Sequence, residues 1–141
     1  MEPRFTFLTL GVDDLERSLK FYRDGLGLAT KGIVGQEFEH GAVVFFDFEG
    51  GMKLALYSRD NVAHDAQTVR SSPSPAEFSI GHLVSSREQV DSLMEQASSA
   101  GAKIVKTAQD AFWGGYHGYF QDSDRHLWEI AWNPNEPAPA S

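Results

Sequence analysis

Two stretches decide the fold: residues 5–12 read Phe-Thr-Phe-Leu-Thr-Leu-Gly-Val, and residues 78–84 read Phe-Ser-Ile-Gly-His-Leu-Val. Each has the composition of a strand, and each is followed by a helical pattern and then by three further strand patterns. A repeated unit of roughly 55 residues cannot bury its hydrophobic face alone, so the two copies are expected to pack together and enclose a cavity. The sequence therefore predicts a duplicated α+β fold.

The first copy, residues 4–58, has the pattern of a β-α-β-β-β unit. Asp13 is the predicted N-cap of a helix over residues 14–24, and Glu16, three positions on, completes a capping box. Gly27 follows the helix and favours its termination. Glycine-containing turns then separate three predicted strands, at residues 28–34, 38–48 and 52–57.

The second copy, residues 76–133, repeats this order and the same capping chemistry. Ser86 and Gln89 predict a capping box, and Gly101 is placed to end the helix that follows. That helix carries four apolar residues on one face: Val90, Leu93, Met94 and Ala97. Three strands complete the copy, at residues 102–106, 113–121 and 126–132.

The rest of the chain is predicted to connect or to trail the two copies within a single domain of residues 1–141. Residues 59–75 are polar, contain the run Ser71-Ser72-Pro73-Ser74-Pro75 and show neither strand nor helix periodicity, which predicts a linker. Residues 134–141 are predicted to be a tail.

The amino-acid composition limits which partners the protein is expected to bind and which chemistry its side chains can perform. A net charge of −8 and a pI of about 5.0 argue against nucleic acid, which requires clustered lysine and arginine. No stretch approaches the roughly 18 consecutive apolar residues of a membrane span, and no secretory segment opens the chain, so a cytoplasmic location is expected. The absence of cysteine excludes disulfides, thiolate metal sites and a cysteine nucleophile.

Two motifs resemble those of a known family. Residues 13–22, Asp-Asp-Leu-Glu-Arg-Ser-Leu-Lys-Phe-Tyr, followed by Gly-Leu-Gly-Leu at 25–28, resemble the first-helix signature of the vicinal oxygen chelate superfamily, which includes glyoxalase, bleomycin resistance proteins and extradiol dioxygenases. Residues 118–129, Gly-Tyr-Phe-Gln-Asp-Ser-Asp-Arg-His-Leu-Trp-Glu, resemble its last hairpin. The resemblance implies two βαβββ modules whose sheets form an incomplete barrel around a cavity.

The last hairpin departs from the family pattern at one turn. The family commonly has Asp-Pro-x-Gly where this chain has Asp122-Ser123-Asp124-Arg125, so an arginine takes a position usually given to glycine. If Arg125 keeps a positive φ, the conformation costs about 1 kcal/mol, and the hairpin is expected to form nonetheless.

The resemblance implies four metal-ligand positions in the cavity. The first falls on Phe7 and the second on Ala55, and neither side chain has a lone pair to donate. The third falls on Ser79 or on His82, depending on strand register, while Glu129 matches the final carboxylate. No cofactor is therefore expected, and the fallback site for a divalent metal is His82 with Glu129. The remaining histidines show no ligand spacing and are interpreted as surface or strand residues: His40, His64, His117 and His126.

An aromatic strand of the second copy supplies candidate cavity walls. Alternation sends Trp113, His117 and Tyr119 to one face, and Tyr116 and Phe120 then lie on the other. Glycines between the rings leave room for a ligand, although they also relieve crowding in an ordinary curved sheet. The ligand cavity is predicted to be lined by Phe7, Thr9, Ala55, Trp113, Tyr116, Phe120 and Glu129.

Two functions stand as hypotheses, beside the further possibility of a subunit or regulatory domain whose cavity is vestigial. The first is a protein like glyoxalase and bleomycin resistance proteins that binds a small organic molecule in the inter-module cavity without the usual metal. The second is a metal-dependent lyase, isomerase or dioxygenase of glyoxalase type with a diverged site. Glu129, beside the aromatic rings, is the candidate general base if the protein is an enzyme. Because family members often pair, the resemblance also implies a homodimer.

Overall fold

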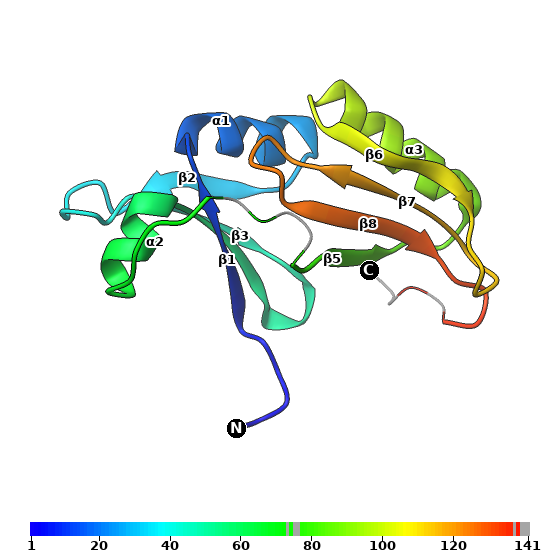
Figure 1. The fold of residues 1–141 in the computed structure, drawn as a ribbon, viewed down its shortest axis with the longest axis horizontal. Coiled ribbons are helices and arrows are strands. Elements are labelled where there is room, and N and C mark those ends of the chain that lie inside the picture. The colour runs from blue at the N-terminus through cyan, green and yellow to red at the C-terminus, as the bar shows by residue number, and fades with distance from the viewer. Residues whose placement is uncertain (73, 75–76, 137, 139–141) are drawn as a thin grey trace. The chain divides into compact units, whose positions relative to one another are not determined.

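The computed structural model describes residues 1–72, 74, 77–136 and 138. The chain divides into two compact units, Met1–Ser72 and Pro73–Ser141, and each contains one four-stranded sheet (Figure 1). The predicted α+β fold with two βαβββ modules is confirmed. Parts of the predicted linker (residues 73 and 75) and of the predicted tail (residues 137 and 139–141) lie outside the described residues.

The first unit follows the predicted order of elements. They are β1 (Phe7–Val12), α1 (Leu15–Leu19), a π-helical segment η1 (Lys20–Gly25), β2 (Thr30–Val34), β3 (Val43–Asp47), a short 3₁₀ turn η2 (Glu49–Gly51), β4 (Lys53–Ser58) and α2 (Arg59–Asp65). The sheet has the order β1-β4-β3-β2, in which β1 runs parallel to β4 and the other neighbours are antiparallel. The largest fully buried side chains of the first unit are Tyr22 from η1 and, from the sheet, Phe46, Leu10, Leu54 and Leu56.

The first helix begins one residue later than predicted. Asp14, not Asp13, is the N-cap, and its carboxylate accepts the backbone N–H of Arg17 at 3.1 Å. Asp13 instead accepts from Arg59 Nε at 2.8 Å and from Arg70 Nη2 at 2.9 Å. With Asp14 as the N-cap, Arg17 rather than Glu16 stands three positions on, so the predicted capping box of Asp13 and Glu16 is wrong.

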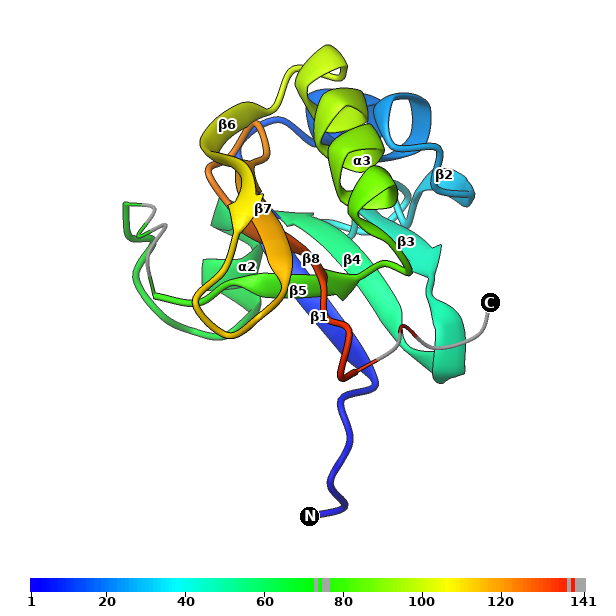
Figure 2. The same ribbon diagram turned by 90° about the vertical axis from the view of Figure 1, so that its right-hand side faces the viewer.

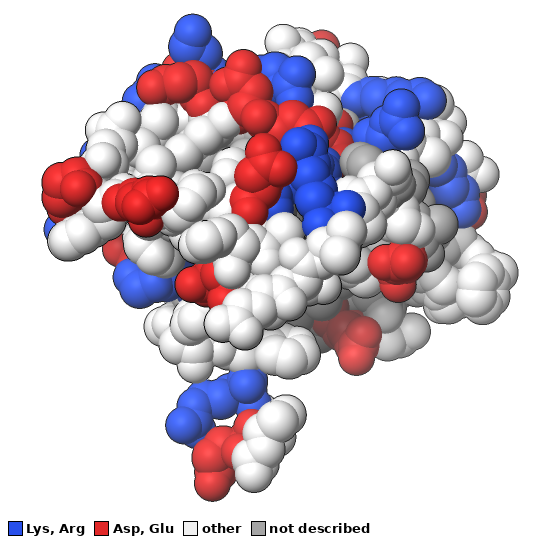
Figure 3. Space-filling model, turned by 60° about the vertical axis from the view of Figure 1, so that its left-hand side comes forward, with Lys and Arg blue, Asp and Glu red and all other residues white. Residues whose placement is uncertain are grey.

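The segment expected to be a plain linker begins with a helix, α2. Ser58 caps it by accepting the backbone N–H of Asn61 at 3.1 Å. The helix has seven residues and buries only Ala63, which is too little to produce a helical hydrophobic period. Its first residue, Arg59, pairs with Asp13 of the β1–α1 turn, and Arg70, beyond the end of the helix, pairs with the same carboxylate. Red and blue side chains adjoin on the face that Figure 3 brings forward.

The second unit repeats the order of the first. Its elements are β5 (Ile80–Leu83), α3 (Arg87–Ser99), β6 (Lys103–Asp110), β7 (Tyr116–Gln121) and β8 (Leu127–Trp132), with the sheet order β5-β8-β7-β6. Ser86 caps α3 as predicted, accepting from the backbone N–H of Gln89, and Gly101 follows the helix at φ +102°. Among the described residues, no helix combines the length and the apolar character needed to cross a membrane.

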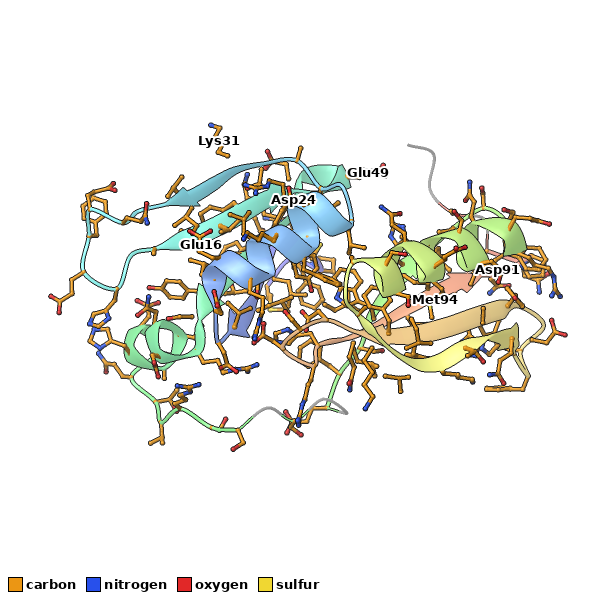
Figure 4. All side chains as sticks on the ribbon, turned by 90° about the horizontal axis from the view of Figure 1, so that it is seen from above. Glu16, Asp24, Lys31, Glu49, Asp91 and Met94 are labelled. Atoms are coloured by element: carbon orange, nitrogen blue, oxygen red, sulfur yellow. The ribbon has the colours of Figure 1, made fainter. Side chains whose placement is uncertain are left out.

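Helix α3 covers one face of the second sheet (Figure 2). Its buried residues are Val90, Met94 and Ala97. Figure 4 labels Met94 and Asp91 on this helix; Tyr116 donates its hydroxyl to Asp91 at 2.6 Å. A Cβ built on Gly118 would lie 2.8 Å from the terminal methyl of Met94, so glycine lets strand and helix approach closely there.

Candidate functional site

Strand register assigns the side chains of the second sheet to two faces. Phe120 lies opposite Trp128 and Tyr119 lies opposite Glu129, and opposite residues share a face. Phe120 and Trp128 are buried on the side of α3, where their rings stack at 6.2 Å. The other side, which we call the helix-free face, carries five residues of interest: Lys106, Trp113, His117, Tyr119 and Glu129.

Three residues of the helix-free face form a continuous hydrogen-bonded row. His117 Nδ1 lies 2.7 Å from Glu129 Oε2, and His117 Nε2 lies 3.0 Å from Lys106 Nζ. A lysine ammonium can only donate, so Nε2 is the acceptor and the ring proton sits on Nδ1, which donates to the carboxylate. The side chain of His117 is 7% exposed and that of Glu129 is 25% exposed. The row therefore runs from a partly exposed carboxylate through a buried imidazole to an ammonium.

Two aromatic side chains complete the surroundings of this row. The hydroxyl of Tyr119 is hydrogen bonded to Glu129, and burial, the negative charge of Glu129 and this bond together raise the pKa of Tyr119. The rings of Trp113 and Tyr119 each lie 5.5 Å from the imidazole of His117 in edge-on geometry. Glu129 thus receives two donors, from His117 and from Tyr119.

An irregularity in β6 brings Lys106 to this face. Ile104 pairs with Phe120 and Lys106 pairs with Tyr119, so Val105 is an extra residue in the ladder. Without it, Lys106 would share the face of Ile104, on the side of α3, because side chains alternate along a strand. The bulge also places Val105 beside Lys106 in the same groove.

A shallow groove of about 420 Å³ crosses the second sheet near this row. Its walls combine three apolar side chains, two hydroxyl-bearing side chains and one ammonium: Phe78, Val105, Leu127, Ser79, Tyr119 and Lys106. Gly81 pairs with Glu129, and a Cβ built on it would meet no atom within 4 Å. Open space therefore lies beside the carboxylate.

The structure divides the predicted cavity residues of the aromatic strand. Trp113 and Glu129 lie on the helix-free face, together with His117. Tyr116 and Phe120 lie on the opposite face, where they contact α3 and the core beneath it. Tyr116, His117 and Phe120 alternate along β7, so a single surface of this sheet cannot present all of them. Glu129 lies on the neighbouring β8, and Trp113 lies in the turn before β7 rather than in the strand predicted for it.

The predicted cavity residues of the first copy share a face of the first sheet. Thr9 and Phe45 both pair with Ala55, and Phe7 lies two residues before Thr9 on β1. Phe7 is 62% exposed, whereas Ala55 is buried. This surface presents hydrocarbon at the two positions that the family resemblance assigns to metal ligands.

Register also places the two candidates for the third metal position. His82 pairs with Ile130 and Gly81 pairs with Glu129, so His82 and Glu129 lie on opposite faces. Ser79 lines the groove beside Tyr119 instead. Within residues 1–72, 74, 77–136 and 138, no group of three or more histidine, aspartate or glutamate side chains could hold a metal ion.

The turn between β7 and β8 keeps the unusual backbone expected for it. Arg125 has φ +71°, a conformation that costs a non-glycine residue about 1 kcal/mol. The carboxylate of Asp122 holds the turn, since it accepts from the backbone N–H of Asp124 at 2.9 Å and of His126 at 2.8 Å. It also accepts from the ring of His126 at 2.8 Å. These bonds keep the β7–β8 register that joins Tyr119 to Glu129.

Comparisons with known proteins agree with the fold of two βαβββ modules. The family model described as Glyoxalase/Bleomycin resistance protein/Dioxygenase superfamily matches residues 4–130. A glyoxalase-related enzyme from Fulvimarina pelagi is 33% identical and superposes with a TM-score of 0.84, over 98% of this chain and 94% of that one. A search of curated proteins found no match.

More distant solved structures share the fold. The fosfomycin resistance protein FosX from Listeria monocytogenes is 22% identical, with a TM-score of 0.69 over 94% of this chain and 95% of that one. A lactoylglutathione lyase from Agrobacterium tumefaciens is 18% identical, with a TM-score of 0.69 over 99% of this chain and 100% of that one. The family match, the 33% identical relative and the repeated modules together show that the chain belongs to the glyoxalase/bleomycin resistance protein/dioxygenase superfamily.

Proposed function

We propose that this protein binds a small organic molecule on the helix-free face of its second sheet, and that it does so without a divalent metal ion. The observation that carries the proposal is that Glu129 is already hydrogen bonded within the protein. Its carboxylate already accepts hydrogen bonds from the imidazole of His117 and the hydroxyl of Tyr119. A carboxylate held by two protein donors serves to orient those donors.

The donor set at the four family positions does not fit a divalent metal. Phe7 and Ala55 offer no lone pair, and Ser79 offers only a neutral hydroxyl. Glu129 is then the single carboxylate, whereas catalytic zinc sites usually have three protein ligands. A cation at Glu129 would also have to displace the N–H of His117, which lies 2.7 Å from Oε2. The residues therefore support metal-independent binding.

The groove offers what an organic ligand needs. Phe78, Val105 and Leu127 form apolar walls, and the phenol ring of Tyr119 adds a flat surface with a polar edge. Gly81 leaves space beside Glu129 in which the ligand can extend along the sheet. In this proposal Glu129 is a positioning residue, because it fixes the tautomer of His117.

Nuclear magnetic resonance titration of ¹⁵N-labelled protein tests the proposal. A panel of small aromatic and aliphatic molecules is added before and after treatment with EDTA. We expect shifts concentrated on β5, β6, β7 and β8, with affinities that the chelator does not change. Elemental analysis of protein purified without chelator is expected to show far less than one metal ion per chain.

A matched pair of variants locates the site. Val105→Gln puts a longer polar side chain into the groove and is expected to weaken binding, whereas Val69→Gln alters another exposed valine in the first unit and is expected to leave binding unchanged. Stoichiometric zinc, nickel, iron or manganese in the purified protein, or binding that is lost with EDTA, would contradict the proposal.

A further inference from the structure

We infer that the ligand of the groove is an organic carboxylate, and that Lys106 binds its negatively charged group. This inference rests on the proposed function, because it specifies the chemistry of the molecule that the groove takes. The six groove-lining residues include one charged side chain, that of Lys106. Its ammonium has three N–H donors, and the bond to His117 Nε2 at 3.0 Å uses one of them. Within the part of the chain that the structure describes, the other two donors have no partner and are left for a ligand.

The β-bulge is what makes Lys106 available. The extra residue Val105 turns Lys106 away from the α3 side of the sheet and places the two side chains next to each other in the groove. An ammonium beside an apolar wall suits a molecule with an anionic end and a hydrocarbon body. His117 fixes the position of the ammonium, since it accepts one of its protons and is itself held by Glu129.

The negative charge of Glu129 does not create a competing site for a cation. Its Oε2 accepts from His117, and Tyr119 provides a second donor. The chain has a net charge of −8, which by itself would favour cationic ligands, but the local donors around Lys106 favour an anion. The hydroxyl of Ser79 lines the same groove and offers a further donor for a carboxylate oxygen.

Three probes with the same ring and different charge test the inference: 2-naphthoate, 2-naphthamide and 2-naphthylmethylamine. Each is titrated into ¹⁵N-labelled protein, and the shifts of the β5–β8 amides give the dissociation constants. We expect 2-naphthoate to bind about tenfold more tightly than 2-naphthamide, because a hydrogen bond to a charged partner is among the stronger ones. The amine is expected to bind most weakly.

Variants assign the preference to one side chain. Lys106→Met keeps the length of the side chain and removes its charge, and it is expected to weaken 2-naphthoate binding about tenfold while 2-naphthamide changes less than about twofold. Lys103→Met makes the same change at the start of β6, outside the groove-lining set, and is expected to have no effect. Lys106→Arg keeps the charge and is expected to keep the preference for the anion.

The outcomes separate the inference from the proposed function. If the amide or the amine binds as tightly as 2-naphthoate, or if Lys106→Met leaves 2-naphthoate binding unchanged, the inference is overturned and the binding face stands. If none of the three probes binds at millimolar concentration, both are overturned. If Lys106→Met does not fold, the wild-type protein still decides: added salt must weaken 2-naphthoate binding and leave 2-naphthamide binding unchanged.

Discussion

Replacing Glu129 should destabilise the second unit in proportion to the hydrogen bonding that is lost. Glu129→Ala removes the acceptor of His117, whose side chain is 7% exposed, so the imidazole N–H loses its partner where water has little access. An unpaired buried donor costs about 1–3 kcal/mol, and the lost bond to a charged acceptor adds to this cost. We expect Glu129→Ala to lower the free energy of unfolding by about 3 kcal/mol in total. Glu129→Gln keeps an acceptor of the same shape and removes the charge, so we expect about 1 kcal/mol.

Urea unfolding, monitored by tryptophan fluorescence, measures the loss of stability in the second unit. All three tryptophans, Trp113, Trp128 and Trp132, belong to the second unit, so their emission reports on that unit. Glu95→Ala, an exposed glutamate on α3, is the matched control and is expected to change the free energy of unfolding by less than about 0.5 kcal/mol. A Glu129→Ala protein as stable as the control would refute the view that Glu129 holds His117 in place.

Four further outcomes are expected. Glu129→Gln should lower the pKa of Tyr119 only part of the way to its ordinary value, because burial, the largest cause, remains; ¹³C-tyrosine titration measures this. Since the folded-state pKa of Tyr119 is raised, its contribution to stability is present below pH about 10 and is lost as pH rises through that pKa. Arg59→Ala should lower the free energy of unfolding of the first unit by about 0.5 kcal/mol, measured by circular dichroism. The pKa of Asp13 is lowered by its bond to Arg59, so the difference in stability between wild type and variant should shrink as acid protonates Asp13. Gly115→Ala should cost about 3 kcal/mol in the fluorescence assay, because its methyl group would collide with a backbone carbonyl of β8, and an unchanged midpoint would contradict this packing.

The fold could be predicted because capping residues and glycines in the sequence mark where the helix of each module begins and ends. The Ser86 N-cap and the glycine after each helix are short-range signals, and the structure confirms both, although the side chain of Gln89 accepts from Ser85 rather than from Ser86. Helix α2 is not predictable from the sequence, because seven residues with one buried side chain leave no hydrophobic period. The choice of Asp14 over Asp13 as N-cap was missed because Arg59 and Arg70, far along the chain, take Asp13 as their partner. Long-range partners of this kind are not visible in a local pattern.

The site was only partly predictable, because it depends on register. Residues 118–129 resemble a hairpin, and in the structure the two strands of that hairpin pair Tyr119 with Glu129 and place His117 on the same face. The sequence pattern alone gives His117 as an ordinary strand residue. Lys106 was not predictable. Its face is set by the bulge at Val105, and no glycine or turn residue marks that bulge in the sequence.

The tautomer of His117 tests the central claim most directly. Two-dimensional ¹H–¹⁵N spectra that correlate the imidazole nitrogens with the ring carbon-bound protons show which nitrogen carries the proton. We predict a proton on Nδ1 and an unprotonated Nε2 that accepts from Lys106, with no change on addition of EDTA. A proton on Nε2, or a nitrogen signal that shifts when metal is removed, would contradict the account in which Glu129 orients His117 and His117 orients Lys106.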